Sequence, residues 1–148
     1  MRRILLMAII VVAAGSLSAQ FAQQPDVPAY HATPPAKDAK LPAILSSFDL
    51  VGPSFQNAFQ SHAYVLAAKI SKVIYQQPCY CRCDRSAGHT SLHSCFEGTH
   101  GAHCSTCLKE LYLAYKLHKE GKSATQIRQA IERGEFEAID LQTAANIN

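Results

Sequence analysis

The chain has 148 residues, a formal net charge of +3 and an aromatic content of only 8%. This length fits a single domain, and loss of Arg2 and Arg3 with the N-terminal segment described below lowers the charge by two, to +1. A nearly neutral chain lacks the basic surface that nucleic-acid binding requires, so we expect no nucleic-acid partner. The sequence also has no phosphate-binding loop, nucleophile elbow or paired carboxylates. The cysteines and histidines are therefore the candidate carriers of chemistry.

The N-terminus has the pattern of a secretory signal peptide. A basic Met1–Arg3 precedes Ile4–Gly15, an apolar run too short for a typical membrane span, and small residues follow it. We expect residues 1–19 to be this signal, with cleavage after Ser18 or Ala19. The mature chain would then be periplasmic or extracellular, with no stable membrane span. An uncleaved anchor is the alternative interpretation. No cysteine stands directly after the apolar run, so lipid anchoring is not supported.

The next hundred residues alternate between patterned and unpatterned stretches. Residues 20–40 are rich in Pro, Ala and Gln and have no apolar period, which predicts a flexible spacer. Leu41–Leu50 is long enough for one helical turn. Apolar side chains recur at steps of three and four over Ser54–Tyr75, which predicts a helix starting after Pro53. Cys79–His103 has neither a helical nor a strand period. A loop of this length inside a compact domain needs something to tie it down.

Two more helices are predicted beyond this loop. Cys104–Glu120 carries apolar residues on one face, and Gly121 is a natural C-terminal stop. Ser123 and Gln126 then form a capping-box pattern, which predicts a third helix ending at Gly134.

The predicted fold is all-α. Residues 41–135 are expected to form a small bundle of three to four short helices with a long, irregular, Cys/His-rich loop. Residues 136–148 are weakly patterned, and we expect them to form a C-terminal tail with at most one further turn.

All six cysteines lie beyond the signal, and five of them stand in two motifs. Cys79, Cys81 and Cys83 occupy alternate positions. A disulfide between neighbours would close a small strained ring, whereas three sulfurs on a short backbone can wrap a soft metal ion. Cys104 and Cys107 form Cys-x-x-Cys at a predicted helix start, one turn apart, where the helix N-terminus favours thiolates. Sulfur and imidazole ligands suit Cu(I) and Zn(II).

Three functions are compatible with this pattern. The interpretation that we favour is an exported soft-metal-binding protein, with copper slightly ahead of zinc, acting in metal carriage, sequestration or structural stabilisation. Its partners would be the metal ion and another exported metal or redox protein. One alternative is a thiol–disulfide oxidoreductase using Cys104 and Cys107 or the triple-cysteine loop, although no thioredoxin-like alternation of strands and helices surrounds the Cys-x-x-Cys motif. The other is a disulfide-stabilised interaction protein, because six cysteines can form three bridges in an oxidising compartment. One disulfide together with one metal site is a further state that the pattern allows.

The motif residues resemble the bacterial PCYCGC-motif family, also described as CYCXC proteins. Pro78–Cys83 resembles its signature, with Arg82 where glycine is common, and the resemblance extends over roughly residues 41–133. The family is exported or lipid-anchored. Some members are described as selenoproteins, which implies redox or soft-metal chemistry.

The resemblance also implies a set of metal-site residues. Eight positions match the family's motifs: Cys79, Cys81, Cys83, His89, Cys95, His100, Cys104 and Cys107. His93 and His103 lie in the same loop and are candidates on proximity alone. Eight ligands suffice for two four-coordinate ions.

Overall fold

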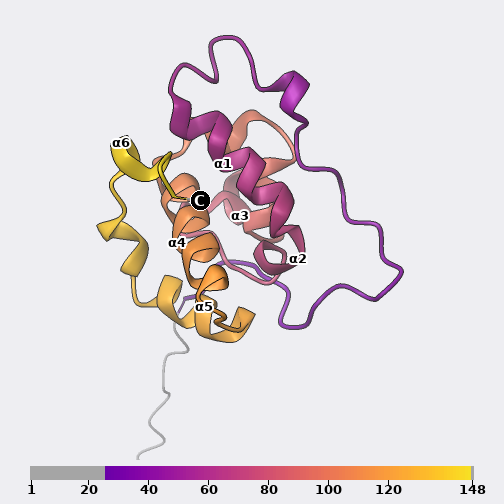
Figure 1. Ribbon diagram of the computed structural model, residues 1–148. Helices are drawn as coiled ribbons and strands as arrows, with labels where there is room; N and C mark the ends of the chain where they lie inside the picture. The colour runs from indigo at the N-terminus through magenta and orange to yellow at the C-terminus, as the bar shows by residue number, and fades with distance from the viewer. Residues whose placement is uncertain (1–25, 148) are drawn as a thin grey trace, which may run out of the picture.

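The computed structural model describes residues 26–147, and its regular elements there are all helical, which confirms the predicted all-α class (Figure 1). The predicted signal peptide lies outside these residues. The elements in chain order are η1 (Ser47–Asp49), α1 (Ala58–Lys69), α2 (Ser71–Ile74), α3 (Cys83–Ser86), η2 (Leu92–Phe96), η3 (Thr99–His103), α4 (Ser105–Lys119), α5 (Ala124–Glu132), η4 (Glu135–Ala138) and α6 (Leu141–Ala144), where η marks a 3-10 helix. Within the described residues, no helix has both the length and the apolar character needed to cross a bilayer.

The central element is α4, which contacts α1 on one side and α5 and η4 on another (Figure 1). Its predicted bounds are confirmed to within a residue. Leu111 and Tyr112 on α4 are fully buried, and the Tyr112 hydroxyl donates a hydrogen bond to the Phe59 carbonyl of α1 at 2.8 Å. The predicted capping box of α5 is also present, because Gln126 N–H donates to Ser123 Oγ at 3.3 Å.

The helix predicted over Ser54–Tyr75 is observed as two helices with a later start. Asn57 and Gln60 form the capping box of α1, with Asn57 N–H donating to Gln60 Oε1 at 2.8 Å. The preceding residues form a turn in which Phe55 N–H reaches the Gly52 carbonyl. At Ile70, φ of −118° interrupts the helix before α2. The local capping pair therefore sets the start of α1 at Ala58, four residues after the predicted start at Ser54.

The stretch predicted as an irregular loop consists of three short helical elements, α3, η2 and η3, and α1 holds its second half in place. The Tyr64 hydroxyl of α1 donates to the Gly98 carbonyl at 2.7 Å and accepts from Ala102 N–H at 3.1 Å. Its ring packs edge-on against Phe96, with 5.0 Å between the ring centroids. Burial raises the pKa of Tyr64 to about 12. The chain around His100 is thereby fixed to the body of the bundle.

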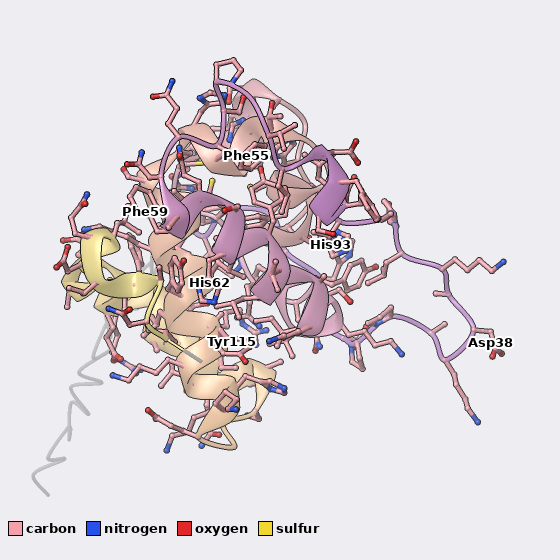
Figure 2. The ribbon with its side chains drawn as sticks, turned by 45° about the horizontal axis from the view of Figure 1, so that its top comes forward. Asp38, Phe55, Phe59, His62, His93 and Tyr115 are labelled. Carbon is pink, nitrogen blue, oxygen red and sulfur yellow. The ribbon has the colours of Figure 1, made fainter. Side chains whose placement is uncertain are left out.

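Both ends of the described chain make contacts that the sequence did not indicate. The loose tail predicted for residues 136–148 is wrong over 136–147, because Phe136 and Ala144 are buried and α6 packs against α1 and α4. Within the predicted spacer, Asp26 pairs with Arg85 at 2.8 Å and so contacts the cysteine loop. The spacer then swings outward, and Asp38 lies at its far end, away from the helices (Figure 2).

Gly101 offers a test of how tightly the loop is packed. A Cβ atom at this position would lie 2.9 Å from both the Cys95 carbonyl oxygen and Phe96 Cε1. We expect Gly101→Ala to lower the free energy of unfolding by about 1–3 kcal/mol, because a backbone oxygen cannot move aside cheaply. Gly98→Ala is the matched control, since nothing lies within 4 Å of its Cβ. Chemical denaturation of both variants measures the difference, and equal stabilities would contradict the packing described here.

Glu110 is a fully buried carboxylate in α4. Its Oε1 accepts the Tyr80 N–H at 2.7 Å, while Oε2 has no hydrogen-bond partner among the described residues. Burial raises the pKa of Glu110 from 4.5 to about 8. The folded state therefore holds this proton more tightly than the unfolded chain does. The associated stability is fully present below pH 4.5 and is lost as the pH rises through about 8.

Replacing Glu110 with Gln keeps the acceptor for Tyr80 and removes the titration. The quantity to follow is the unfolding free energy of the metal-free wild type minus that of Glu110→Gln. We expect this difference to fall by on the order of 4 kcal/mol between pH 4.5 and pH 9. Denaturation of both proteins at each pH measures this difference, in which the titration of the other groups cancels. A difference that does not change with pH would show that folding does not raise the pKa of Glu110.

Candidate metal centre

A tight turn gathers the first two cysteines. Arg82 N–H donates to the Cys79 carbonyl at 3.2 Å, which closes the turn before α3 begins at Cys83. Arg82 itself has φ of 61° and is the one non-glycine residue with a positive φ in the described part of the chain. This left-handed residue reverses the chain locally, and the sulfurs of Cys79 and Cys81 lie 3.3 Å apart.

The second sulfur pair comes from the start of α4. Cys104 occupies the N-cap position and Cys107 lies in the first turn, as the Cys-x-x-Cys spacing predicted. Cys107 Sγ lies 3.4 Å from Cys79 Sγ and 3.5 Å from Cys81 Sγ, so three sulfurs form a triangle. Across the loop, Cys83 and Cys95 approach to 3.4 Å.

None of these contacts is a disulfide. All six cysteines lie in the described residues and all six are free thiols, and a sulfur–sulfur bond is only about 2.05 Å long. The contact distances of 3.3–3.5 Å are instead near the spacing of thiolates around one ion. A tetrahedral site with Zn–S bonds of about 2.3 Å holds its sulfurs about 3.8 Å apart.

Two histidines complete the same cluster. His89 Nδ1 lies 3.4 Å from Cys95 Sγ, and His100 Nε2 lies 3.8 Å from Cys81 Sγ. Their rings pack edge-to-face with centroids 4.7 Å apart. One imidazole therefore comes from the stretch between α3 and η2, and the other comes from η3.

Three overlapping groups of four side chains have all their ligand atoms within 4.8 Å of one another. Together they contain all eight residues that the sequence nominated, which we name the Cys/His cluster. The groups are Cys79, Cys81, Cys83 and Cys95; Cys81, His100, Cys104 and Cys107; and Cys83, His89, Cys95 and His100. Their mutual distances fit the coordination of a metal ion, although they do not identify the metal.

The two histidines nominated on proximity alone point elsewhere. His93 Nδ1 contacts Glu97 Oε1 at 2.9 Å, and His103 Nε2 contacts Ser54 Oγ at 2.8 Å. Neither residue belongs to any of the three groups. Proximity in sequence is a poor guide here because each 3-10 turn rotates successive side chains by about 120°.

Contacts between neighbouring thiols shift their pKa values in opposite directions. The hydrogen bond with Cys104 lowers the pKa of Cys81, and the one with Cys79 lowers the pKa of Cys83. The hydrogen bond with Cys107 raises the pKa of Cys79. Metal binding to these thiols releases their protons, so the affinity of the cluster for a metal ion depends on pH.

The cluster has an inner and an outer side. Cys79, Cys83, Cys95 and Cys107 are buried, whereas Cys81, His89, His100 and Cys104 are half-exposed. An ion can reach the outer ligands from solvent, and the inner sulfurs can then hold it away from water.

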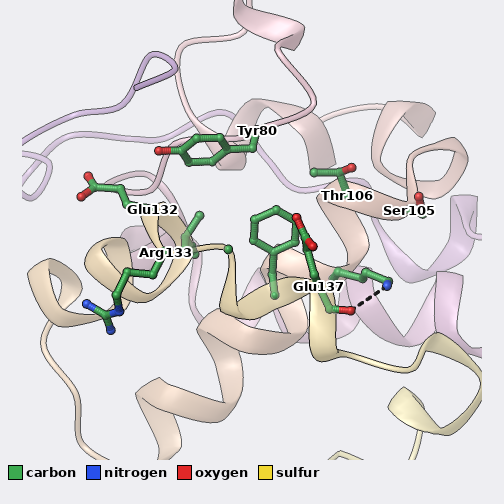
Figure 3. A pocket seen from close by; sticks show the side chains of 10 residues that line it. Tyr80, Ser105, Thr106, Glu132, Arg133 and Glu137 are labelled. Atoms are coloured by element: carbon green, nitrogen blue, oxygen red, sulfur yellow. Dashed lines mark hydrogen bonds between the residues drawn. The ribbon is translucent and has the colours of Figure 1, made fainter. Parts of the chain in front are cut away.

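A separate pocket of about 530 Å³ lies on the other side of the cysteine turn, between α4, α5 and η4 (Figure 3). Tyr80 lines it, although the neighbouring Cys79 and Cys81 belong to the cluster. Lys109 closes one side by donating to the Glu137 carbonyl at 3.0 Å. No member of the Cys/His cluster lines this pocket, so the candidate chemistry and the pocket are distinct.

Of the comparisons with known proteins, the one with protein families agrees with the motif. No curated protein and no solved structure matches the chain. One family matches residues 8–140 and is described as a protein of unknown function with PCYCGC motif. That match spans most of the chain, including every member of the Cys/His cluster. The chain belongs to the PCYCGC family.

Proposed function

We propose that this chain is an exported soft-metal-binding protein whose Cys/His cluster holds Cu(I) or Zn(II). The observation that carries the proposal is the meeting of six sulfurs and two imidazole nitrogens in overlapping four-member groups. Thiolate and imidazole are the ligands of Cu(I) and Zn(II), and carboxylates, which harder ions prefer, are absent from all three groups. The sulfur majority favours copper.

The half-exposed outer ligands support carriage or sequestration over a purely structural role. A structural zinc site is closed, with all four ligands fixed by the fold. Here Cys81 and Cys104 are open enough for another exported metal or redox protein to take the ion by ligand exchange. The proposed export rests on the signal pattern of residues 1–19.

Metal binding is tested on the reduced full-length protein without oxygen. Cys81 belongs to two of the three groups, so we expect Cys81→Ser to weaken binding of Cu(I) on the order of 100-fold or more. The matched control is His103→Ala, which alters a histidine of the same loop outside every group and should leave affinity unchanged. Competition with a chromophoric Cu(I) chelator measures both affinities.

Wild-type protein purified from the compartment to which it is exported, without added reductant, separates the competing functions. Elemental analysis and thiol counting should find bound copper or zinc together with six reactive thiols after denaturation and chelation. No bound metal in the wild type, with the thiols consumed in disulfides, would contradict the proposal and favour the disulfide-stabilised alternative. Turnover of a disulfide substrate that is lost in Cys104→Ser would favour the oxidoreductase.

Export is tested independently of metal. Expression of the full chain in a bacterium that processes secretory signals should yield a mature protein beginning at Ala19 or Gln20, which intact-mass measurement distinguishes. Retention of Met1 in the cell-envelope fraction would instead show an uncleaved anchor.

A further inference from the structure

We infer that the Cys/His cluster is two adjacent and chemically unlike metal sites, an inference that rests on the proposed function. Cys79, Cys81, Cys104 and Cys107 form an all-sulfur site for Cu(I). The remaining four residues, Cys83, His89, Cys95 and His100, form a mixed sulfur–nitrogen site for Zn(II). The two sites differ in ligand type, in the elements that supply them and in the ion that they prefer.

The mixed site is supplied by one continuous segment. Its four ligand atoms all lie within 4.8 Å of one another. Cys83 and Cys95 approach to 3.4 Å, and His89 Nδ1 lies 3.4 Å from Cys95 Sγ. Two thiolates and two imidazoles are a common zinc set, and they leave the site less electron-rich than four sulfurs would.

The all-sulfur site joins two segments. Cys79 and Cys81 come from the turn before α3, and Cys107 comes from the first turn of α4. The three sulfurs are mutually 3.3–3.5 Å apart. Cys104 belongs to a group with Cys81 and Cys107, which supplies the fourth sulfur. A set of thiolates without nitrogen or oxygen suits the softer ion, Cu(I), better than the mixed set does.

Ligand number decides between one ion and two. A four-coordinate ion uses only half of the eight ligands, so a single ion would leave four converging side chains without a role. His100 belongs to two of the three groups, yet a neutral imidazole has one free lone pair and can bind only one ion. With the mixed site filled, His100 belongs to that site, and Cys79 is the sulfur that completes the other.

Cysteine sulfurs from both sites lie next to one another. Cys79, Cys81, Cys83 and Cys95 form the third group, and this group takes two members from each site. Cys81 Sγ also lies only 3.8 Å from His100 Nε2. An ion in one site is therefore separated from the other by a single layer of sulfurs, and a thiolate of that layer can bridge both ions.

The inference is tested by counting ions in the reduced, metal-free full chain and in variants of each site. We expect the wild type and the His103→Ala control to bind two Co(II) or Zn(II) ions per chain. Cys104→Ser and His89→Ala should each keep one ion. Serine is a favourable N-cap residue, so Cys104→Ser should leave α4 intact, and His100→Ala is a second mixed-site variant should His89→Ala fail to fold.

Spectra identify which site survives in each variant. Co(II) reports the number of bound thiolates through its sulfur-to-metal charge-transfer absorption. The ion kept by His89→Ala should show the stronger absorption of an all-sulfur site, and the ion kept by Cys104→Ser the weaker absorption of a mixed site. Cu(I) competition should show a larger loss of affinity in Cys104→Ser than in His89→Ala.

The outcomes separate this inference from the proposed function. One ion per wild-type chain would overturn the two-site inference while leaving metal binding in place. Loss of both ions in each single-site variant would overturn it as well, because it would show one indivisible site. No bound ion of any kind in the wild type would contradict the proposed function, and the two-site inference with it.

Discussion

The convergence of six cysteine sulfurs beside the N-terminus of α4 is the constraint on which the middle of this structure depends. Residues 79–104 contain only short helical turns, which cannot bury a large apolar face by themselves. Buried sulfurs join Leu92 and Phe96 in the core of this segment. Because adjacent thiolates repel one another, protons or metal cations must balance their charge. The order of this segment is therefore coupled to the chemistry of its ligands.

Two long helices hold the cluster from opposite sides. Tyr64 of α1 fixes the backbone on either side of His100 with a pair of hydrogen bonds. Glu110 of α4 fixes the turn between Cys79 and Cys81 by accepting the Tyr80 N–H. A charged carboxylate at this buried position would carry a larger desolvation cost than a neutral hydrogen-bond acceptor. The carboxyl is tolerated because burial raises its pKa, which keeps the proton on the group at neutral pH.

The predictable parts of this fold are those set by residues close in sequence. The apolar period of α4 and the Ser123–Gln126 capping box could both be predicted from the sequence, because helix periodicity and capping act within a few residues. The start of α1 was misplaced because Pro53 is a visible signal and the Asn57–Gln60 pair is a subtler one. The burial of Phe136 and Ala144 could not be inferred, because their partners lie on α1 and α4.

The sequence predicted which residues form the candidate site, but it did not predict how they are arranged. Residue chemistry and the family motif nominated the eight members of the Cys/His cluster, and the fold brings all eight together. Neither could show how they divide, because each site is defined by distances across the loop. The burial of Glu110 was not predicted either, because a lone glutamate in a predicted helix is usually a surface residue. Its position one turn after Cys107 is the signal that places it on the buried face.

Arg82 shows how this chain departs from its family without losing the turn. The motif PCYCGC has glycine at this position, and the φ of 61° explains why, since a side chain in the left-handed region costs about 1 kcal/mol. The arginine gives something that glycine cannot: its guanidinium pairs with Asp26 at 3.3 Å, beside the Asp26–Arg85 pair. Ala29 N–H adds a bond to Asp84. These exposed contacts are individually weak, but together they lay residues 26–29 against the triple-cysteine turn. The strained arginine and the ordered segment that it holds are thus parts of one arrangement, which supports the turn from outside while Glu110 supports it from within.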